Sequence, residues 1–276
     1  MLLELGRSCF DVTTRSLVMG ILNRTPDSFF DRGMYWDMDA FLRRAEQLVA
    51  EGADLLDVGG VKAGPGPEVT EAEEMDRVVP AITALRARFD VPLSVDTWRA
   101  SVARQAYRAG AVLGNDISGF ADPGYLLEAA EAGASVVATH IRLGPRIPDP
   151  DPHYDDVVEE VGRFLSDRAG QARAAGIPDS RIIVDAGLDL GKTAAQSRSL
   201  LAASDRLVSL GWTVLLSASN KTFLGAAFDL LVGDRWEPTV AAHALGVSLG
   251  CRILRAHDVR AARRVCDTLA AVMEAA

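Results

Sequence analysis

The stretch LLDVGGVKAGPG, residues 55–66, contains the pattern that decides the fold. Its apolar run ends in a carboxylate, Asp57, and then opens into a loop of glycine and proline. A buried parallel strand has this appearance when it delivers a polar side chain to a site at its carboxyl end. A single loop of this kind is also consistent with a tight strand-to-helix turn, so recurrence along the chain carries the prediction.

The same pattern recurs eight times. Eight short apolar segments are each followed by a polar residue and then by a predicted helix, which favours a (β/α)8 TIM barrel, an α/β fold. A short hairpin from 2–5 and 9–12 precedes it. A doubly wound sheet is disfavoured, because only strands at its switch point need polar ends. Residues 1–276 show no linker, so one domain is expected. The predicted strands are 17–22, 55–58, 93–95, 112–114, 135–138, 181–184, 213–216 and 252–254.

Helix signals fill the intervals between these strands. Thr70 and Glu73 form a predicted capping box at the start of a helix, and Gly110 is a predicted C-cap. Residues 144–152, GPRIPDPDP, are rich in proline and are predicted to be a mobile loop outside helix and strand. Residues 24–36 form a second long loop and a candidate lid. The predicted helices are 38–51, 71–89, 99–109, 123–132, 153–175, 194–210, 238–249 and 259–274.

Composition narrows the class of protein. The net charge of −9 and the pI near 5.0 argue against a basic face that binds nucleic acid. The three cysteines are far apart and contain no metal-binding pair, which indicates buried thiols in a reducing compartment. No apolar run reaches about 18 residues and no signal peptide is recognisable, so a cytoplasmic protein that does not enter a membrane is expected.

The polar residues that follow the strands suggest one kind of ligand. Three acids and an amide suit a flat heterocycle rich in N–H donors, because a carboxylate accepts two parallel hydrogen bonds. The cationic side chains suit a polyanion such as pyrophosphate, held in part through Mg²⁺. Each of these polar residues, taken singly, also has a purely structural explanation. Asn115 could cap a turn, and Asp57 could hold its own glycine loop by side-chain-to-backbone hydrogen bonds. The set is Asn23, Asp57, Asp96, Asn115, His140, Asp185, Lys221, Arg255 and His257.

Several motifs together resemble those of the dihydropteroate synthase family, over essentially the whole chain. The resemblance implies a barrel, typically a homodimer, that binds 6-hydroxymethyl-7,8-dihydropterin pyrophosphate. Pyrophosphate then leaves to give a pterin methylene cation, which the amine of p-aminobenzoate attacks. The motifs are MGILNRTPDSFFD at 19–31, DVGG at 57–60, SVDT at 94–97, NDI at 115–117, DAGLDLGK at 185–192, SNK at 219–221 and RAHDV at 255–259.

The resemblance also implies roles for individual residues. Asp96, Asn115, Asp185 and Lys221 would hold the pterin, and Lys221, Asp96 and Asp185 would be the catalytic set. Asn23, Arg255 and His257 would hold pyrophosphate, with Asn23 as the Mg²⁺ ligand. Ser219 would lie near the carboxylate of p-aminobenzoate.

The sequence departs from the family on the acceptor side. The usual second loop DxGGESTRPG reads DVGGVKAGPG, so Val61, Lys62, Ala63 and Gly64 replace Glu, Ser, Thr and Arg. Asn220 stands where arginine usually precedes the site lysine, and Leu190 replaces a phenylalanine. The lost threonine and arginine help bind p-aminobenzoate and pyrophosphate in the family. The pattern is similar to the second, synthase-like copy of some actinobacteria, which is thought not to make dihydropteroate.

Three hypotheses follow. The first is a homologue that keeps the pterin pyrophosphate site but is weak or inactive as a synthase and insensitive to sulfonamides. The second is an active synthase with a rebuilt second loop. The third is a pterin-binding module without enzymatic activity.

Overall fold

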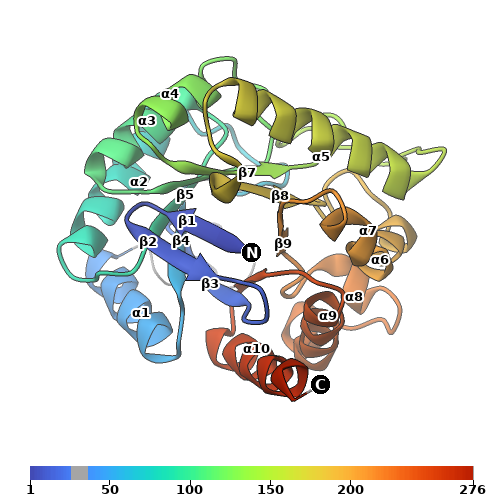
Figure 1. Ribbon diagram of the computed structural model, residues 1–276. Helices are drawn as coiled ribbons and strands as arrows, with labels where there is room; N and C mark the ends of the chain where they lie inside the picture. The colour runs from blue at the N-terminus through green and yellow to red at the C-terminus, as the bar shows by residue number, and fades with distance from the viewer. Residues whose placement is uncertain (26–36, 276) are drawn as a thin grey trace.

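Eight parallel strands close into a barrel surrounded by helices in the computed structural model, which describes residues 1–25 and 37–275 (Figure 1). The strand order around the barrel is β10-β3-β4-β5-β6-β7-β8-β9. The predicted TIM barrel is therefore confirmed. The strands are β3 (Leu17–Asn23), β4 (Leu55–Gly59), β5 (Leu93–Asp96), β6 (Leu113–Asp116), β7 (Ser135–Thr139), β8 (Ile182–Asp185), β9 (Thr213–Leu216) and β10 (Ile253–Ala256).

The strand register brings polar residues together at one end of the barrel. Gly59 pairs with Asp96, and Asp96 pairs in turn with Asn115 on the next strand. Thr139 and Asp185 are paired in the same way on β7 and β8. Since parallel strands all point the same way, the polar residues that end them form one ring.

Helices cover the outside of the barrel, and the predicted cap signals are present. Thr70 and Glu73 form the capping box of α2, and Gly110 adopts a left-handed conformation with φ 115° after α3. The helices are α1 (Met38–Ala50), α2 (Glu71–Arg86), α3 (Ala100–Ala109), α4 (Tyr125–Glu131), α5 (Val157–Ala174), α6 (Ala194–Ala202), α7 (Ser204–Val208), α8 (Thr222–Gly225), α9 (Trp236–Ser248) and α10 (Val259–Glu274).

Most of the predicted helices match the structure to within three residues at each end, and two differ by more than that. The predicted helix 194–210 breaks at Ala203 into α6 and α7, and the Ser204 hydroxyl donates to the Leu201 carbonyl at the break. The predicted helix 153–175 begins only at Val157, because the Asp156 side chain accepts hydrogen bonds from the first-turn amides. Neither difference in helix bounds affects the residues that end the strands.

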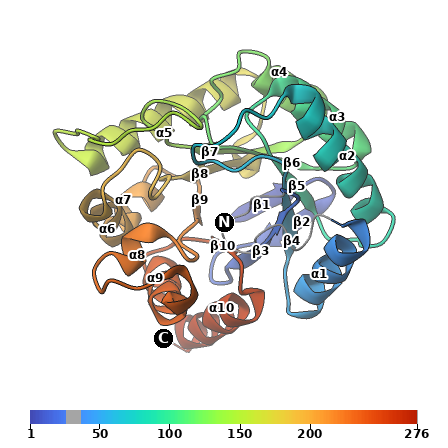
Figure 2. The same cartoon turned by 180° about the vertical axis from the view of Figure 1, so that it is seen from behind.

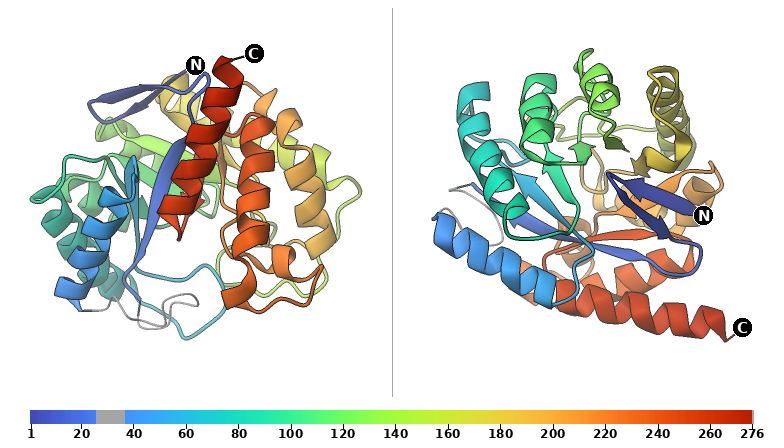
Figure 3. Two further views of the ribbon diagram at one scale, coloured as in Figure 1. Left: turned by 90° about the horizontal axis from the view of Figure 1, so that it is seen from below. Right: turned by 60° about the vertical axis from the view of Figure 1, so that its left-hand side comes forward.

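The N-terminal hairpin closes one end of the barrel (Figure 3, left). The loops that follow the carboxyl ends of the strands lie at the opposite end. The hairpin strands β1 (Leu2–Leu5) and β2 (Ser8–Asp11) pair antiparallel, as predicted. Leu3, Leu5 and Val12 are buried together with the inward-facing side chains at the base of the barrel. This small second core is made of Leu3, Leu5, Val12, Leu17, Met19, Leu55, Leu113, Val137, Ile183, Leu215 and Ile253.

The remaining predictions concern loops and the membrane. Residues 144–152 form neither helix nor strand, as expected. The predicted loop 24–36 lies largely outside the described residues. Within the part of the chain that the structure describes, no helix has the length and apolar character needed to cross a membrane.

Candidate functional site

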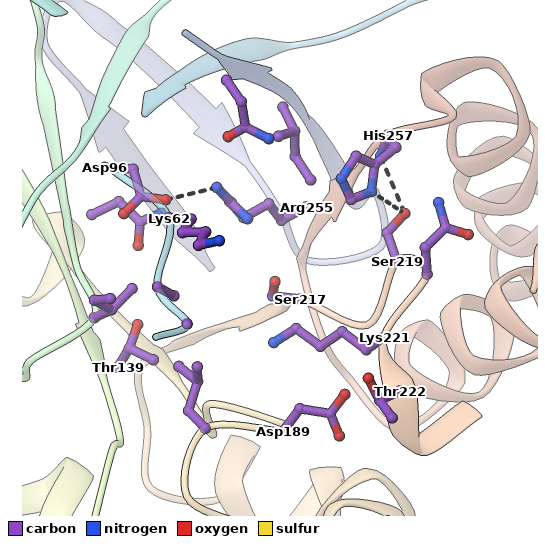
Figure 4. A pocket seen from close by; sticks show the side chains of 18 of the residues that line it. Lys62, Asp96, Thr139, Asp189, Ser217, Ser219, Lys221, Thr222, Arg255 and His257 are labelled. Carbon is purple, nitrogen blue, oxygen red and sulfur yellow. Dashed lines mark hydrogen bonds and ion pairs between the residues drawn. The ribbon is translucent and has the colours of Figure 1, made fainter. Parts of the chain in front are cut away.

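A cavity of about 550 Å³ opens at the carboxyl ends of the strands. Its lining comes from strand ends around the barrel and from the loops that follow β4, β8 and β9 (Figure 4). The residues predicted to hold the pterin, the pyrophosphate and the acceptor all line this one cavity, whereas the strand-end residues Asp57 and His140 do not. Those that line it are Asn23, Lys62, Asp96, Asn115, Asp185, Leu190, Ser219, Asn220, Lys221, Arg255 and His257.

Asp57 organises the floor of the cavity from below. It is fully buried and does not line the cavity. Its Oδ1 accepts a hydrogen bond from the Ser94 hydroxyl at 2.6 Å, and its Oδ2 accepts one from Asn115 Nδ2 at 3.1 Å. The Arg255 Nε donates to the same Oδ2 at 2.7 Å. Asp57 thereby sets the orientation of two side chains that do face the ligand space.

Arg255 bridges two carboxylates. Its second donor, Nη2, lies 2.8 Å from Asp96 Oδ2 (Figure 4). Burial raises the pKa of Asp96 to about 7, although the guanidinium of Arg255 opposes that rise and the charge of Asp57 adds to it. Near neutral pH, Asp96 therefore stands at the point of change between hydrogen-bond donor and pure acceptor.

Asp185 and Lys221 provide a second polar pair. The Asp185 carboxylate accepts a hydrogen bond from the Gly187 amide at 2.8 Å, which fixes its direction. Lys221 Nζ donates to the Leu188 carbonyl at 2.6 Å. Burial raises the pKa of Asp185 and lowers that of Lys221, while the attraction between the two charges works against both shifts. The pair presents an acceptor and a donor to a ligand in the same part of the cavity.

His257 and Ser219 form a contact on another wall. The backbone N–H of His257 donates to Ser219 Oγ at 3.2 Å, and the ring Nδ1 lies 3.0 Å from the same oxygen (Figure 4). Burial and then the positive charge of Arg255 lower the pKa of His257 to about 3. The imidazole is therefore neutral at physiological pH and meets an anion as a hydrogen-bonding group.

His140, one of the polar strand-end residues, does not line the cavity. Its Nδ1 lies 2.8 Å from Lys192 Nζ, and that ammonium also donates to the Gly187 carbonyl at 2.9 Å and the Leu190 carbonyl at 3.0 Å. Burial lowers the pKa of Lys192 to about 7. The pair holds the loop after β8 in place, and the final lysine of the DAGLDLGK motif was the signal for it.

The acceptor side of the cavity is more apolar than its floor. Val61, Ala63 and Pro65 line it from the loop after β4 and Val232 from the segment before α9, while Leu190 lies on the loop after β8. No Phe, Tyr or Trp side chain is among the described residues that line the cavity.

Arg235 and Thr222 are lining residues that the sequence analysis missed. Arg235 Nη1 donates to the Asn220 carbonyl at 2.9 Å, and Asn220 has a left-handed backbone with φ 57°. Neither residue follows a predicted strand directly, so the strand-end pattern gave no sign of them.

Metal ligands of the usual kind are not gathered here. Among the residues that the structure describes, no group of three or more His, Cys, Asp or Glu side chains could hold a metal ion.

Comparison with known proteins assigns the family. The model of the family described as "Pterin binding enzyme" matches residues 19–257. The chain is 39% identical to the dihydropteroate synthase of Synechocystis sp., a match that covers 96% of this chain and 92% of that one. The chain belongs to the dihydropteroate synthase family. The resemblance seen in the motifs is thus confirmed.

Other members of the family are also similar. The chain is 44% identical to the inactive dihydropteroate synthase 2 of Mycobacterium leprae, across 94% of this chain and 91% of the relative. The crystal structure of Yersinia pestis dihydropteroate synthase with a sulfonamide drug complex superposes with a TM-score of 0.95 at 36% identity, with full coverage of both chains. The family thus includes both synthases and a second copy named inactive, and both kinds are similar to this chain.

Proposed function

We propose that this protein is a dihydropteroate synthase homologue that binds dihydropterin pyrophosphate but is weak or inactive as a synthase. The observation that carries the proposal is the gathering of Asp96, Asn115, Asp185 and Lys221 in one cavity whose second loop has lost the family's threonine and arginine. The floor of the site therefore supports binding of a pterin, whereas the changed second loop at its rim argues against efficient synthesis.

The floor suits a pterin. Asp96 and Asp185 each offer carboxylate oxygens, while Asn115 and Lys221 offer donors. The donor-rich edge of a pterin ring would find two acceptors, and its carbonyl and ring nitrogens would find the amide and the ammonium. Contacts to buried charged groups of this kind are worth about 1.5–3 kcal/mol each.

The pyrophosphate would lie between Asn23, Arg255 and His257, which line the same cavity. The Asn23 amide oxygen fits Mg²⁺, which typically takes one protein oxygen together with substrate phosphates and waters. The Asn23 Oδ1 and the Asp96 Oδ2 both lie close to Gly59. A Cβ on that glycine would be 3.3 Å from the first oxygen and 3.7 Å from the second. When bound, Mg²⁺ would neutralise charge on the leaving pyrophosphate.

The changed second loop is the reason to expect weak synthesis. Heterolysis of the C–O bond passes its electron pair to pyrophosphate, so cations near that group stabilise the transition state. Each contact of this type is worth about 3 kcal/mol, or two to three powers of ten in rate. Arg255 already shares its charge with Asp57 and Asp96, which leaves less of it for a ligand. Poor binding of p-aminobenzoate and of sulfonamides is expected for the same loop.

One assay tests the proposal. The protein is incubated with 6-hydroxymethyl-7,8-dihydropterin pyrophosphate and Mg²⁺, with and without p-aminobenzoate, and binding, pyrophosphate and pterin products are measured. Tight binding with slow release that does not depend on the amine supports the proposal. Absence of binding would refute it.

The other outcomes belong to the two alternatives. Rapid release that depends on p-aminobenzoate would make the protein an active synthase, an alternative supported by its 39% identity to the Synechocystis enzyme. Tight binding with no release of pyrophosphate at all would make it a pterin-binding module. A homodimer is proposed in each case, and sedimentation velocity tests it.

A further inference from the structure

We propose that Arg146, on the proline-rich loop after β7, is a positioning residue that holds the loop after β4 so that Lys62 faces the cavity. This inference rests on the proposed function, because it concerns the changed second loop that is expected to weaken contacts to the pyrophosphate. Arg146 itself is not among the cavity-lining residues. Its contacts are to the backbone that carries Lys62.

Arg146 makes three hydrogen bonds to one short loop. Its backbone N–H donates to the Ala63 carbonyl at 3.1 Å, and its Nη1 donates to the Lys62 carbonyl at 3.2 Å. Its Nη2 also donates to the Pro67 carbonyl. A guanidinium can reach two carbonyls in this way because its donors form a fixed planar fork, which a lysine ammonium does not reproduce.

The conformation of Arg146 indicates that these bonds determine it. Its φ of 64° lies in the left-handed region, which residues other than glycine seldom adopt. Such a conformation persists only where surrounding contacts hold it. Here the backbone N–H of Arg146 donates to the Ala63 carbonyl on the loop after β4, and the Ile147 amide donates to the Gly144 carbonyl across the same turn at 3.4 Å.

Gly66 shows how closely the two segments fit. A Cβ on Gly66 would lie 2.8 Å from Lys62 Cε and 3.3 Å from Arg146 Nη2. The stem of Lys62 therefore packs over a glycine that Arg146 also covers. Arg146 restrains Lys62 both through its carbonyl and through this shared surface.

The proline-rich loop is itself anchored at its other end. Arg142 Nε and Asp149 Oδ2 are 2.6 Å apart within the loop. The Tyr154 hydroxyl donates to the Gly191 carbonyl at 2.7 Å, next to the loop that carries Leu190. Segment 142–154 thus joins the loops after β4 and β8, which bring Lys62 and Leu190 to the cavity.

Trypsin cleavage after Lys62 tests the contact without any ligand. The full-length Arg146→Met variant is expected to be cut at the Lys62–Ala63 bond at least tenfold faster than the parent, because the loop opens more often. Arg146→Lys should fall between the two, and Tyr154→Phe should also speed cleavage by loosening the far anchor. Arg206→Met, which removes an arginine paired with Glu159 on the outer surface, is the control and should leave the rate unchanged.

Binding provides the second readout. Arg146→Met is expected to weaken binding of 6-hydroxymethyl-7,8-dihydropterin pyrophosphate at least fivefold, and to leave the Kd of the same pterin without pyrophosphate within twofold. General damage to the fold would weaken both. Cleavage rates within twofold of the parent, or equal losses for the two pterins, would overturn the inference. Failure of the parent to bind either pterin would refute the proposed function and leave the cleavage result intact.

Discussion

At the scale of single residues, Asp57 is the clearest case of a group that shapes a site without entering it. It is fully buried and accepts hydrogen bonds from Ser94, Asn115 and Arg255. Arg255 would keep only Asp96 if this carboxylate were lost. We therefore expect Asp57→Ala to lower the free energy of unfolding by about 3–5 kcal/mol, as when one partner of a buried ion pair is removed.

Urea denaturation followed by circular dichroism measures this loss. Asp90→Ala is the matched control, since Asp90 is exposed and forms a surface ion pair with Arg86. It should leave the midpoint unchanged. A midpoint for Asp57→Ala equal to that of the parent would show that Arg255 does not need this partner.

Asp96 gives a prediction on pH. Its pKa near 7 means that the carboxylate becomes a neutral acid as the pH falls below 7. If the ionised form accepts the pterin N–H groups, affinity should fall about tenfold for each pH unit below 7 and level off above 8. Asp96→Asn should bind more weakly at pH 8 and show no such slope, which corrects for titration of the pterin itself. Calorimetry from pH 5.5 to 8.5 measures both, and parallel curves would contradict the prediction.

The same shift acts on stability with a definite sign. Because the pKa of Asp96 in the folded state lies above its ordinary value of 3.8, the folded protein binds the proton more tightly than the unfolded chain. Its contribution to stability is therefore full below about pH 4 and is lost as the pH rises towards 7. Near neutral pH, the ionised Asp96 therefore lowers the free energy of unfolding of the ligand-free protein, as is common for residues at a binding site.

At the scale of elements, α2 depends on its first turn. Thr70 Oγ1 accepts from the Glu73 amide at 3.3 Å, and the Glu73 side chain accepts from the Thr70 amide at 2.8 Å. Thr70→Ala should lower the free energy of unfolding by about 1 kcal/mol. Thr83→Ala is the control within the same helix, because that hydroxyl only donates to the Val79 carbonyl. Equal midpoints for the two variants would mean that the cap contributes nothing.

The strands were predictable because each is a buried apolar run with a polar residue at its end. The predicted strand 55–58, for example, differs from β4 by one residue. The break between α6 and α7 was not predictable, because neither proline nor glycine stands at position 203. The Ser204 hydroxyl donates to the Leu201 carbonyl at this break. Short local signals reveal buried strands and caps, whereas breaks set by packing leave no local mark.

The candidate site divides in the same way. Asp96 and Asn115 come together because strand pairing aligns them, so a sequence pattern at strand ends was enough to collect them. Arg146 contacts a loop that is distant in the sequence, and Arg235 follows no strand directly. Their roles depend on how the loops cross the barrel mouth, and no spacing in the sequence encodes that crossing.

At the scale of the whole molecule, the cavity combines a floor fixed by the barrel with a rim made of loops. The floor is attached to eight paired strands, and the hairpin closes the opposite end of the barrel (Figure 2 shows the barrel from behind). Changes in the second loop can therefore alter the rim while the floor stays intact.

The rim gives the last prediction, Gly64→Arg. A Cβ at Gly64 meets no atom within 4 Å, so a side chain can leave the backbone there without a clash at its first atom. The variant restores the cation that the family carries in its second loop. If the pyrophosphate binds as proposed, its release should rise by about two powers of ten. Gly170→Arg on α5, where a Cβ also meets open space, adds the same charge on a surface helix and should change nothing. Release within threefold of the parent would show that the missing arginine does not limit this protein.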